Sequence, residues 1–329
     1  MKKIAWVKIS SRKYGGVAYE ETAQEILRSD FEVEPVRINS RIFKRGYLRA
    51  PEVFFNLLRL KGEKNLWVRD SNTIITLPFD RTRGKNLAVI HHIDFSQSKF
   101  PFKIIDFFIE KMIYHGLKSA DMIVTVSEYW RNHFVEKGYS NVQKIYNCFD
   151  MANFNISKEE AEYFKKEYKL EGKPIVYLGS PQRAKGVLES CEVLKGLDCY
   201  LVTSGEPLVE ARALNLQLEY KDYLRLMKAA SVVVQMSKFK EGWCRIAHEA
   251  MLLGTPVIGS GRGGMGELLE RGGQIICKDF NQLRERIEYL LNNPQKREEM
   301  SETGFNFAKT FTLERFKEKW LEVIKEITN

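Results

Sequence analysis

The residues best suited to chemistry lie in one stretch, EGWCRIAHEAMLLGTPVIGSGRGG, residues 241–264. Its two glutamates, Glu241 and Glu249, have seven residues between them. Apolar residues recur at helical spacing inside the stretch, which predicts a short helix beginning near Trp243 or Cys244. The glutamates can accept hydrogen bonds from sugar hydroxyls. The unpaired N–H groups at the helix start suit a phosphate.

Spacing alone favours a plainer interpretation, an ordinary surface helix with two solvated glutamates. Gly242 precedes the helix and lets a ligand approach the backbone. A second glycine-rich turn, residues 260–264, follows the helix after one short apolar strand, and this turn weakens the plainer interpretation.

Elsewhere, buried apolar runs alternate with helical segments along the whole chain. Two such series follow one another, which predicts two doubly wound parallel sheets in an α/β protein. The strands are expected at residues 3–9, 31–38, 65–69, 73–76, 87–90, 121–126, 142–145, 174–178, 199–203, 231–235 and 257–258. The first helix is expected near Tyr19, after a loop that contains Gly15 and Gly16. His91 ends the strand at 87–90, where open α/β sheets place ligands.

Residues 100–118 are rich in aromatic and aliphatic side chains and predict a helix that Pro101 begins. Most of these side chains are expected in the core, and a membrane-facing role for some of them is the alternative. The apolar residues concerned are Phe100, Phe102, Ile105, Phe108, Ile109, Met112 and Ile113.

The chain has 329 residues and a net charge of +9. Residues 1–150 hold 25 Lys and Arg against 17 Asp and Glu, so nearly all of the excess is N-terminal. Within 37–49, cations including Arg41, Lys44 and Arg45 alternate with apolar residues, a pattern that suits a membrane surface. The pattern would also suit nucleic acid, and a basic surface helix explains it equally well.

Five cysteines without a CxxC pair indicate reduced thiols in the cytoplasm. Lys8 interrupts the apolar N-terminal run, so we expect a first strand there and no targeting segment. No stretch approaches the roughly 20 apolar residues of a membrane helix. The expected location is the cytoplasm. The basic stretch at 37–49 adds the expectation of peripheral contact with the inner face of the membrane.

Over nearly its whole length the sequence resembles the retaining GT-B glycosyltransferases of the "glycosyl transferases group 1" family. The motifs are EGWCRIAHEAMLLGTPVIGSGRGGMGELL, YLGSPQRAKGV, ADMIVTVSEYW and KIYNCFDMANF. The resemblance implies two Rossmann-like domains facing a cleft. Residues 1–150, joined by a returning helix at 312–329, would bind the acceptor, and residues 151–311 would bind the nucleotide sugar.

The resemblance also implies roles for single residues. Glu249 would bind the nucleotide ribose, Glu241 the sugar hydroxyls, and Lys185 the diphosphate as it leaves. His91 would lie near the transferred sugar, with His92 in its place if the register shifts by one. Further donor-binding positions are Gly16, Gly179, Arg183, Gly242, Trp243, Cys244 and Arg245.

The sequence departs from the family pattern inside these motifs. Ser180 stands where the family usually has an arginine, and Arg183 could supply that charge from within the loop. Cys244 and His248 replace residues that are usually small or apolar.

The implied activity is a metal-independent hexosyl transfer from a UDP-, GDP- or ADP-sugar to a glycan or lipid-linked acceptor, with no cofactor. The absence of a DxD motif leaves Lys185 and helix N-termini to stabilise the leaving diphosphate. One alternative is a GT-B nucleotide-sugar epimerase. Another is a non-catalytic membrane or nucleic-acid binder, although no nucleic acid is expected as a partner.

Overall fold

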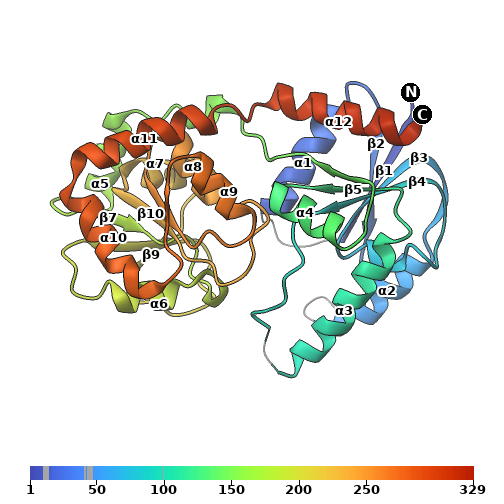
Figure 1. Ribbon diagram of the computed structural model, residues 1–329, viewed down its shortest axis with the longest axis horizontal. Coiled ribbons are helices and arrows are strands. Elements are labelled where there is room, and N and C mark those ends of the chain that lie inside the picture. Colours follow the sequence, from blue (N-terminus) through green and yellow to red (C-terminus); the bar gives the residue numbers. More distant parts are fainter. Residues whose placement is uncertain (10–14, 41, 43–46, 99) are drawn as a thin grey trace. The chain divides into compact units, whose positions relative to one another are not determined.

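A computed structural model describes residues 1–9, 15–40, 42, 47–98 and 100–329. Their contacts divide the chain into two compact units. Unit 1 contains residues 1–148 and 313–329, and unit 2 contains residues 149–312. Each unit is built on a parallel sheet with helices on both faces (Figure 1).

In unit 1 the described strands form one sheet in the order β2-β1-β3-β4-β5-β6. The order reverses between β1 and β3, and open α/β sheets bind ligands beyond the carboxyl ends of strands at such a point. The strands are β1 (Lys3–Ile9), β2 (Glu32–Ile38), β3 (Lys61–Asp70), β4 (Arg81–Ile90), β5 (Met122–Thr125) and β6 (Val142–Lys144).

The helices of unit 1 include one from each end of the chain. Trp320 of the last helix lies 5.5 Å from Trp6 of β1 between ring centroids, and Phe316 meets Tyr19 edge-on at 5.0 Å. These buried aromatic contacts hold the C-terminal helix in unit 1. The helices are α1 (Gly15–Leu27), α2 (Ala50–Leu58), α3 (Phe102–Leu117), α4 (Glu128–Glu136) and α12 (Leu313–Thr328), with short 3-10 turns η1 (Tyr47–Arg49) and η2 (Ile74–Thr76).

The sheet of unit 2 has the order β12-β11-β10-β7-β8-β9, so its reversal point lies between β7 and β10. The loops after these two strands therefore start side by side. The strands are β7 (Ile175–Tyr177), β8 (Tyr200–Ser204), β9 (Leu214–Leu216), β10 (Val232–Gln235), β11 (Val257–Gly259) and β12 (Ile275–Ile276).

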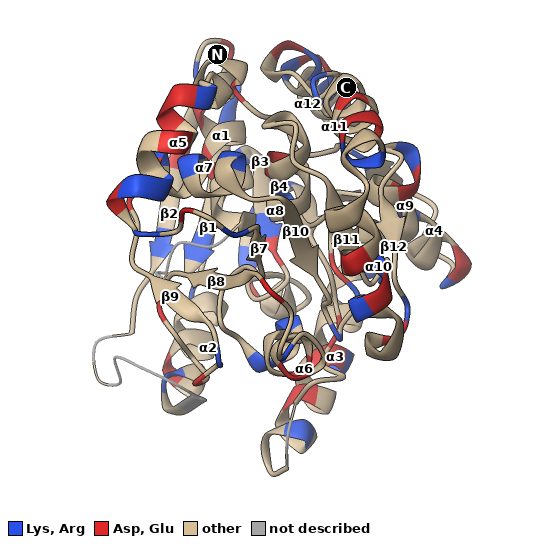
Figure 2. Cartoon of the chain, turned by 90° about the vertical axis from the view of Figure 1, so that its left-hand side faces the viewer, with Lys and Arg blue, Asp and Glu red and all other residues tan. Residues whose placement is uncertain are grey.

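Acidic and basic residues are interspersed along the helices around this sheet (Figure 2). In α5 the first turn is acidic and the last turn is basic, which complements the helix dipole. Ser157 caps this helix with a capping box. The helices are α5 (Lys158–Glu167), α6 (Val187–Val193), α7 (Tyr220–Ala229), α8 (Arg245–Leu252), α9 (Gly264–Arg271), α10 (Phe280–Asn292) and α11 (Pro294–Ala308), with 3-10 turns η3 (Met151–Phe154) and η4 (Arg183–Lys185).

The prediction that most apolar residues of 100–118 lie in the core was wrong. Ile113 is buried, but the apolar side chains before it are exposed or only partly buried. Helical periodicity reports which residues share a face, and it cannot report whether anything covers that face.

Three local predictions were also wrong. The expected strand at 73–76 is a 3-10 turn, because Asp70 Oδ1 accepts hydrogen bonds from the N–H groups of Asn72 and Thr73 and winds the chain. The first helix begins at Gly15, several residues before Tyr19. The short strands β9 and β12 at the sheet edges were not predicted.

Among the described helices, none combines the length and apolar character that crossing a bilayer requires.

Candidate active site

An ion pair joins two predicted site residues of unit 2. Lys185 Nζ lies 2.5 Å from Glu241 Oε1, and the hydroxyl of Ser237 donates to the same oxygen at 2.5 Å. Both charged side chains are mostly buried. Burial acts to lower the pKa of Lys185, but the Glu241 carboxylate outweighs it and holds that pKa above its ordinary value. The lysine is therefore a fixed positive charge.

The reversal point of the sheet brings these residues together. Lys185 ends the 3-10 turn η4 after β7, and Glu241 follows β10. The N–H of Lys238 donates to the carbonyl of Ala184 at 2.8 Å and joins the two loops. Gly186 has φ +70, and a Cβ there would lie 2.3 Å from a backbone oxygen of Met236.

The glycine-rich turn after β11 supports the backbone of Glu241. The Glu241 N–H donates to Arg262, and the Gly264 N–H donates back to the Glu241 carbonyl at 2.9 Å. Gly263 lies between them with φ +67, and a Cβ on it would lie 2.4 Å from that carbonyl oxygen. Only glycine fits there without a backbone shift.

Gly263→Ala is therefore expected to destabilise unit 2 by more than about 2 kcal/mol, because backbone strain of ~1–3 kcal/mol adds to a backbone clash. It should also displace Glu241 and its ion pair with Lys185. Thermal melting measures the loss of stability, and a crystal structure of the variant shows the displacement. Gly172→Ala is the matched control, since Gly172 has φ +82 but faces open space. Equal losses in the two variants would contradict the support role.

Helix α8 begins one residue later than its predicted start. Cys244 precedes it in the left-handed conformation, with φ 76 and ψ 74. Burial raises the pKa of its thiol to about 12, and repulsion from Glu241 adds to this shift. The thiol is therefore protonated at neutral pH and is not poised as a nucleophile. Trp243 and Cys244 are buried, and Gly242 is buried beside them.

Glu249 is buried one turn into α8. Tyr223 of α7 donates its hydroxyl to Glu249 Oε2 at 2.8 Å, and Arg245 Nη2 lies 3.4 Å from Oε1. Burial raises the pKa of Glu249, and Arg245 opposes this shift. These two partners fix the orientation of the carboxylate. Tyr223 was not predicted as a site residue, because nothing in the spacing of α7 relates it to Glu249.

His248, which stands where the family is usually apolar, has a packing role. Trp243 Nε1 donates to His248 Nδ1 at 2.9 Å. An indole nitrogen only donates, so the imidazole proton is on Nε2, which lies 3.1 Å from the Ala308 carbonyl oxygen. The ring lies between Phe149 and Phe311, at 4.3 and 4.9 Å. Burial lowers the pKa of His248 to about 3.

The loop after β7 carries the other predicted positions. Gly179 has φ +76, and a Cβ there would lie 2.7 Å from Gln235 Nε2. Ser180 accepts a hydrogen bond from the Gln182 side chain at 3.0 Å. Arg183 is exposed at the start of η4, two residues before Lys185. Its charge is thus near the loop position that Ser180 leaves neutral.

Gly16 and His91 belong to unit 1. Gly16 lies in the first turn of α1, and His91 directly follows β4. His91 Nε2 is buried, lies 3.8 Å from Glu20 Oε1, and makes no hydrogen bond within the described residues. The other oxygen of Glu20 accepts from Trp6 Nε1 at 3.1 Å. Glu20 is a second residue that the sequence did not reveal.

His92 is exposed beside His91. Arg41, Lys44 and Arg45 lie outside the described residues.

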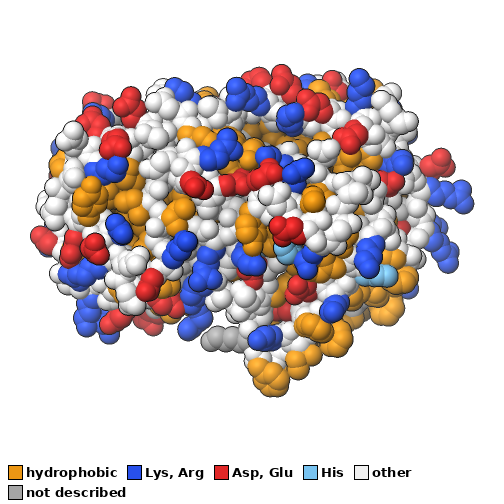
Figure 3. Space-filling view, in the orientation of Figure 1, with side chains coloured by type: hydrophobic (Ala, Val, Ile, Leu, Met, Phe, Trp, Pro, Cys, Tyr) orange, Lys and Arg blue, Asp and Glu red, His pale blue; other side chains and the backbone are white. Residues whose placement is uncertain are grey.

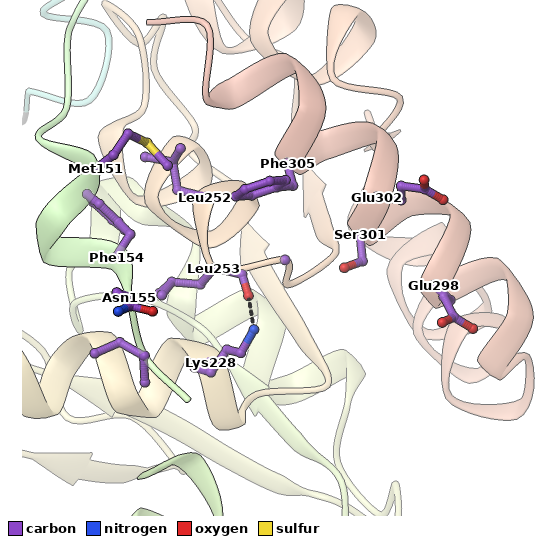
Figure 4. Close-up of a pocket in the computed structure, with 12 residues that line it drawn as sticks. Met151, Phe154, Asn155, Lys228, Leu252, Leu253, Glu298, Ser301, Glu302 and Phe305 are labelled. Carbon is purple, nitrogen blue, oxygen red and sulfur yellow. Dashed lines mark hydrogen bonds between the residues drawn. The ribbon is translucent and has the colours of Figure 1, made fainter. Parts of the chain in front are cut away.

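A pocket of about 620 Å³ in unit 2 lies at the C-terminal end of α8 (Figure 4). It includes Leu252 and Leu253 at the C-terminal end of α8, together with Phe154 and Phe305. Lys228 reaches into this region and donates to the Leu253 carbonyl at 2.8 Å. Glu241 and Lys185 lie at the opposite end of α8, so this pocket is not part of the candidate site.

Residues 159–307, nearly all of unit 2, match the family described as "Glycosyl transferases group 1". Spore coat protein SA of Bacillus subtilis is 28% identical over 249 residues, 64% of this chain and 66% of that protein. A Methanocaldococcus jannaschii protein named as an uncharacterized glycosyltransferase is 26% identical over 217 residues, 61% of this chain and 58% of that protein. The chain thus spans less than two thirds of the length of either relative.

Among solved structures, HepE of Anabaena in complex with UDP-glucose has a TM-score of 0.78 at 16% identity, with 99% of this chain and 100% of that one covered. This likeness concerns the fold. Together with the two parallel sheets it confirms the predicted GT-B class of α/β architecture.

Proposed function

We propose that this protein is a glycosyltransferase that moves a sugar from a nucleotide-diphosphate sugar to an acceptor with retention of configuration, because residues 159–307 match the glycosyl transferases group 1 family. The observation that carries the proposal is the ion pair of Lys185 and Glu241, which lies within the matched residues before α8. The complex of HepE with UDP-glucose supports a nucleotide sugar as donor.

Lys185 is suited to neutralise the leaving diphosphate. Its ammonium is held by Glu241 at 2.5 Å before any substrate arrives, so little reorganisation accompanies the reaction. Arg183 adds a second positive charge from the same turn, and the N-terminal amides of α8 add the positive end of a helix dipole. This set of charges can act without a metal ion, and metal independence is part of the proposal.

The two glutamates have separate roles in this proposal. Glu241 accepts hydrogen bonds from hydroxyls of the donor sugar while it orients Lys185. Glu249, held by Tyr223 and Arg245, accepts hydrogen bonds from the ribose hydroxyls. A buried carboxylate discriminates strongly for a ligand that offers hydroxyl donors.

The reaction breaks the bond between the anomeric carbon and the diphosphate oxygen, whose electron pair leaves with the nucleoside diphosphate. The acceptor oxygen forms the new bond and passes its proton to the departing diphosphate. Following the resemblance, we assign His91 and Gly16 to the sugar side of this reaction. Glu20, 3.8 Å from His91 Nε2, would orient the imidazole.

The acceptor is proposed to be a glycan or a lipid-linked glycan at the inner face of the membrane. The positive charge of residues 1–150 supports an anionic partner.

Glu249→Gln is expected to raise the dissociation constant for the nucleoside diphosphate about 10- to 100-fold, because a hydrogen bond to a charged group contributes ~1.5–3 kcal/mol. Thermal-shift screening of UDP, GDP and ADP first selects the nucleotide. Isothermal titration then measures its affinity for wild type and variant.

The variant should fold as well as wild type, because the substitution removes a buried charge and leaves an amide that can accept from Tyr223. Glu270→Gln, an exposed change on α9, serves as the control and should bind normally. Unchanged nucleotide affinity in Glu249→Gln would overturn the ribose assignment.

A further inference from the structure

The first half of α3 exposes an unusual number of large apolar side chains. Phe107 and Phe108 are 54% and 61% exposed, and Phe100, just before the helix, is 80% exposed. Phe102, Ile104 and Ile105 are also exposed. Contiguous apolar surface of this kind on a water-soluble protein marks an interaction site.

This half of α3 projects from unit 1 while the other half is anchored. Ile113 and Leu117 pack into the core beneath β4 and β5, and Gly116 lies against the backbone of Ile74. Figure 1 shows the helix extending away from the sheet, and Figure 3, in the same orientation, shows hydrophobic side chains gathered over its far end. At about 100° per residue, Ile104, Ile105 and Phe107 point in different directions, so solvent meets apolar groups around the helix.

An apolar pocket of about 620 Å³ lies between α3 and α2. Ile105, Ile109 and Met112 line it from α3, and Val53, Phe54 and Phe55 line it from α2. Its volume lies within the roughly 300–1,000 Å³ range of small-molecule sites. Its polar residues, Arg49, Asp70 and Asn72, are few.

The position of the pocket in the fold favours a ligand. Ile9 and Asp70, which end β1 and β3, both line it. These strands flank the reversal point of the sheet of unit 1, where open α/β sheets bind ligands. The pocket is therefore placed as a binding site, and its lining suits a hydrocarbon chain.

The charges around this surface favour an anionic lipid over a second copy of the chain. Lys103 and Lys111 lie on α3, Lys118 directly follows it, and Arg49 lies at the pocket. The acidic residues of the same helix are the buried Asp106 and the half-buried Glu110. The Lys111 ammonium lies 5.3 Å over the ring of Phe107, so cation and aromatic ring share one surface. Cations beside aromatic rings suit the phosphate and acyl layers of a bilayer. In a dimer formed through this surface, the cations of one copy would face the same cations of the other copy and repel them.

We propose that α3 docks the protein on an anionic bilayer, with Phe107 and Phe108 in the acyl boundary, and that the pocket between α2 and α3 takes one hydrocarbon chain of a lipid. The docking of α3 on a bilayer does not depend on the proposed function. We further infer that the lipid in the pocket is the sugar acceptor, which would make the acceptor lipid-linked, and this second step rests on the proposed function.

The first experiment is flotation of the full chain with vesicles. Wild type should bind vesicles of phosphatidylglycerol and phosphatidylcholine in equal parts, and should bind pure phosphatidylcholine vesicles more weakly. In the double variant Phe107→Ser, Phe108→Ser the partition coefficient for these vesicles should fall at least roughly tenfold, because two exposed aromatic anchors are removed. Leu208→Ser, an equally exposed apolar change in unit 2, should bind as wild type.

The second experiment addresses the pocket. Dihexanoyl phosphatidylglycerol, below its micelle concentration, should bind wild type saturably in calorimetric titration. Met112→Trp should weaken that binding roughly tenfold by filling the pocket, with vesicle flotation retained.

Several outcomes would overturn the inference. The inference is wrong if wild type does not float with vesicles, if the serine variant floats equally well, or if phosphatidylglycerol does not increase the binding of wild type. It is also wrong if wild type forms a dimer that the serine variant does not form while neither protein binds vesicles. Nucleotide binding is measured separately on the same variants, which should all retain it. A failure of the nucleotide site is thereby distinguished from a failure of the docking surface.

Discussion

Lys185→Ala is expected to lower kcat/KM for sugar transfer by about 10²–10³-fold, the effect of removing one pre-oriented group that stabilises developing charge. The ammonium is lost from the point where the diphosphate departs. Glu241 then keeps a buried carboxylate with Ser237 as a donor but without its cation. Initial rates of nucleoside diphosphate release and product formation measure the loss.

Two further variants separate charge from folding. Lys185→Arg keeps the charge but changes its geometry, so it should retain part of the activity. Lys173→Ala removes a lysine of unit 2 from an exposed pair with Asp198 and should leave the rate unchanged. Wild-type rates in Lys185→Ala on the true donor would exclude this lysine from the reaction.

Acid should destabilise unit 2 through His248. Its pKa is about 3 in the folded protein and about 6.5 when exposed, so the unfolded chain binds the extra proton between these values. The stability contributed by the neutral ring is complete above pH 6.5 and is lost as pH falls toward 3. At pH 4.5 the loss is about 2–3 kcal/mol, from 1.36 kcal/mol per pH unit.

His248→Gln tests this linkage without removing both hydrogen bonds, since an amide can accept from Trp243 and donate to Ala308. At pH 7.5 the variant should be somewhat less stable than wild type, because the ring contacts with Phe149 and Phe311 are lost. That deficit should shrink as pH falls to 4.5. Urea unfolding followed by hydrogen exchange of α8 measures both values.

His115→Gln, an exposed histidine of α3, provides the comparison and should show the wild-type pH dependence. A constant difference between wild type and His248→Gln across this range would show that the ring is not the source of the acid sensitivity.

Much of the fold was predictable because its signals are local. Three of the four strands at the reversal points, β1, β7 and β10, are short apolar runs that lie within or at one residue of the predicted bounds, while β3 begins four residues before its predicted start. Gly254 and Gly263 mark turns that only glycine enters easily. The motif around α8 could therefore be placed on its elements before any contact was known.

The candidate site was predictable only in part. Lys185 and Glu241 were both named, but the ion pair between them arises where two loops, more than fifty residues apart in sequence, leave adjacent strands. Tyr223 and Glu20 were missed for the same reason. Each meets its partner across the fold, and a single sequence carries no local sign of such a meeting.

By itself the sequence determined the class of the protein: two α/β units, a cationic loop, and two glutamates on either side of a helix start. Those properties depend on periodicity and residue type, which the chain carries locally. The tertiary structure alone decided that Lys185 is held by Glu241, that His248 is a neutral ring between two phenylalanines, and that the apolar half of α3 is uncovered. Each of these depends on what packs against a side chain, and packing is set by segments distant in sequence.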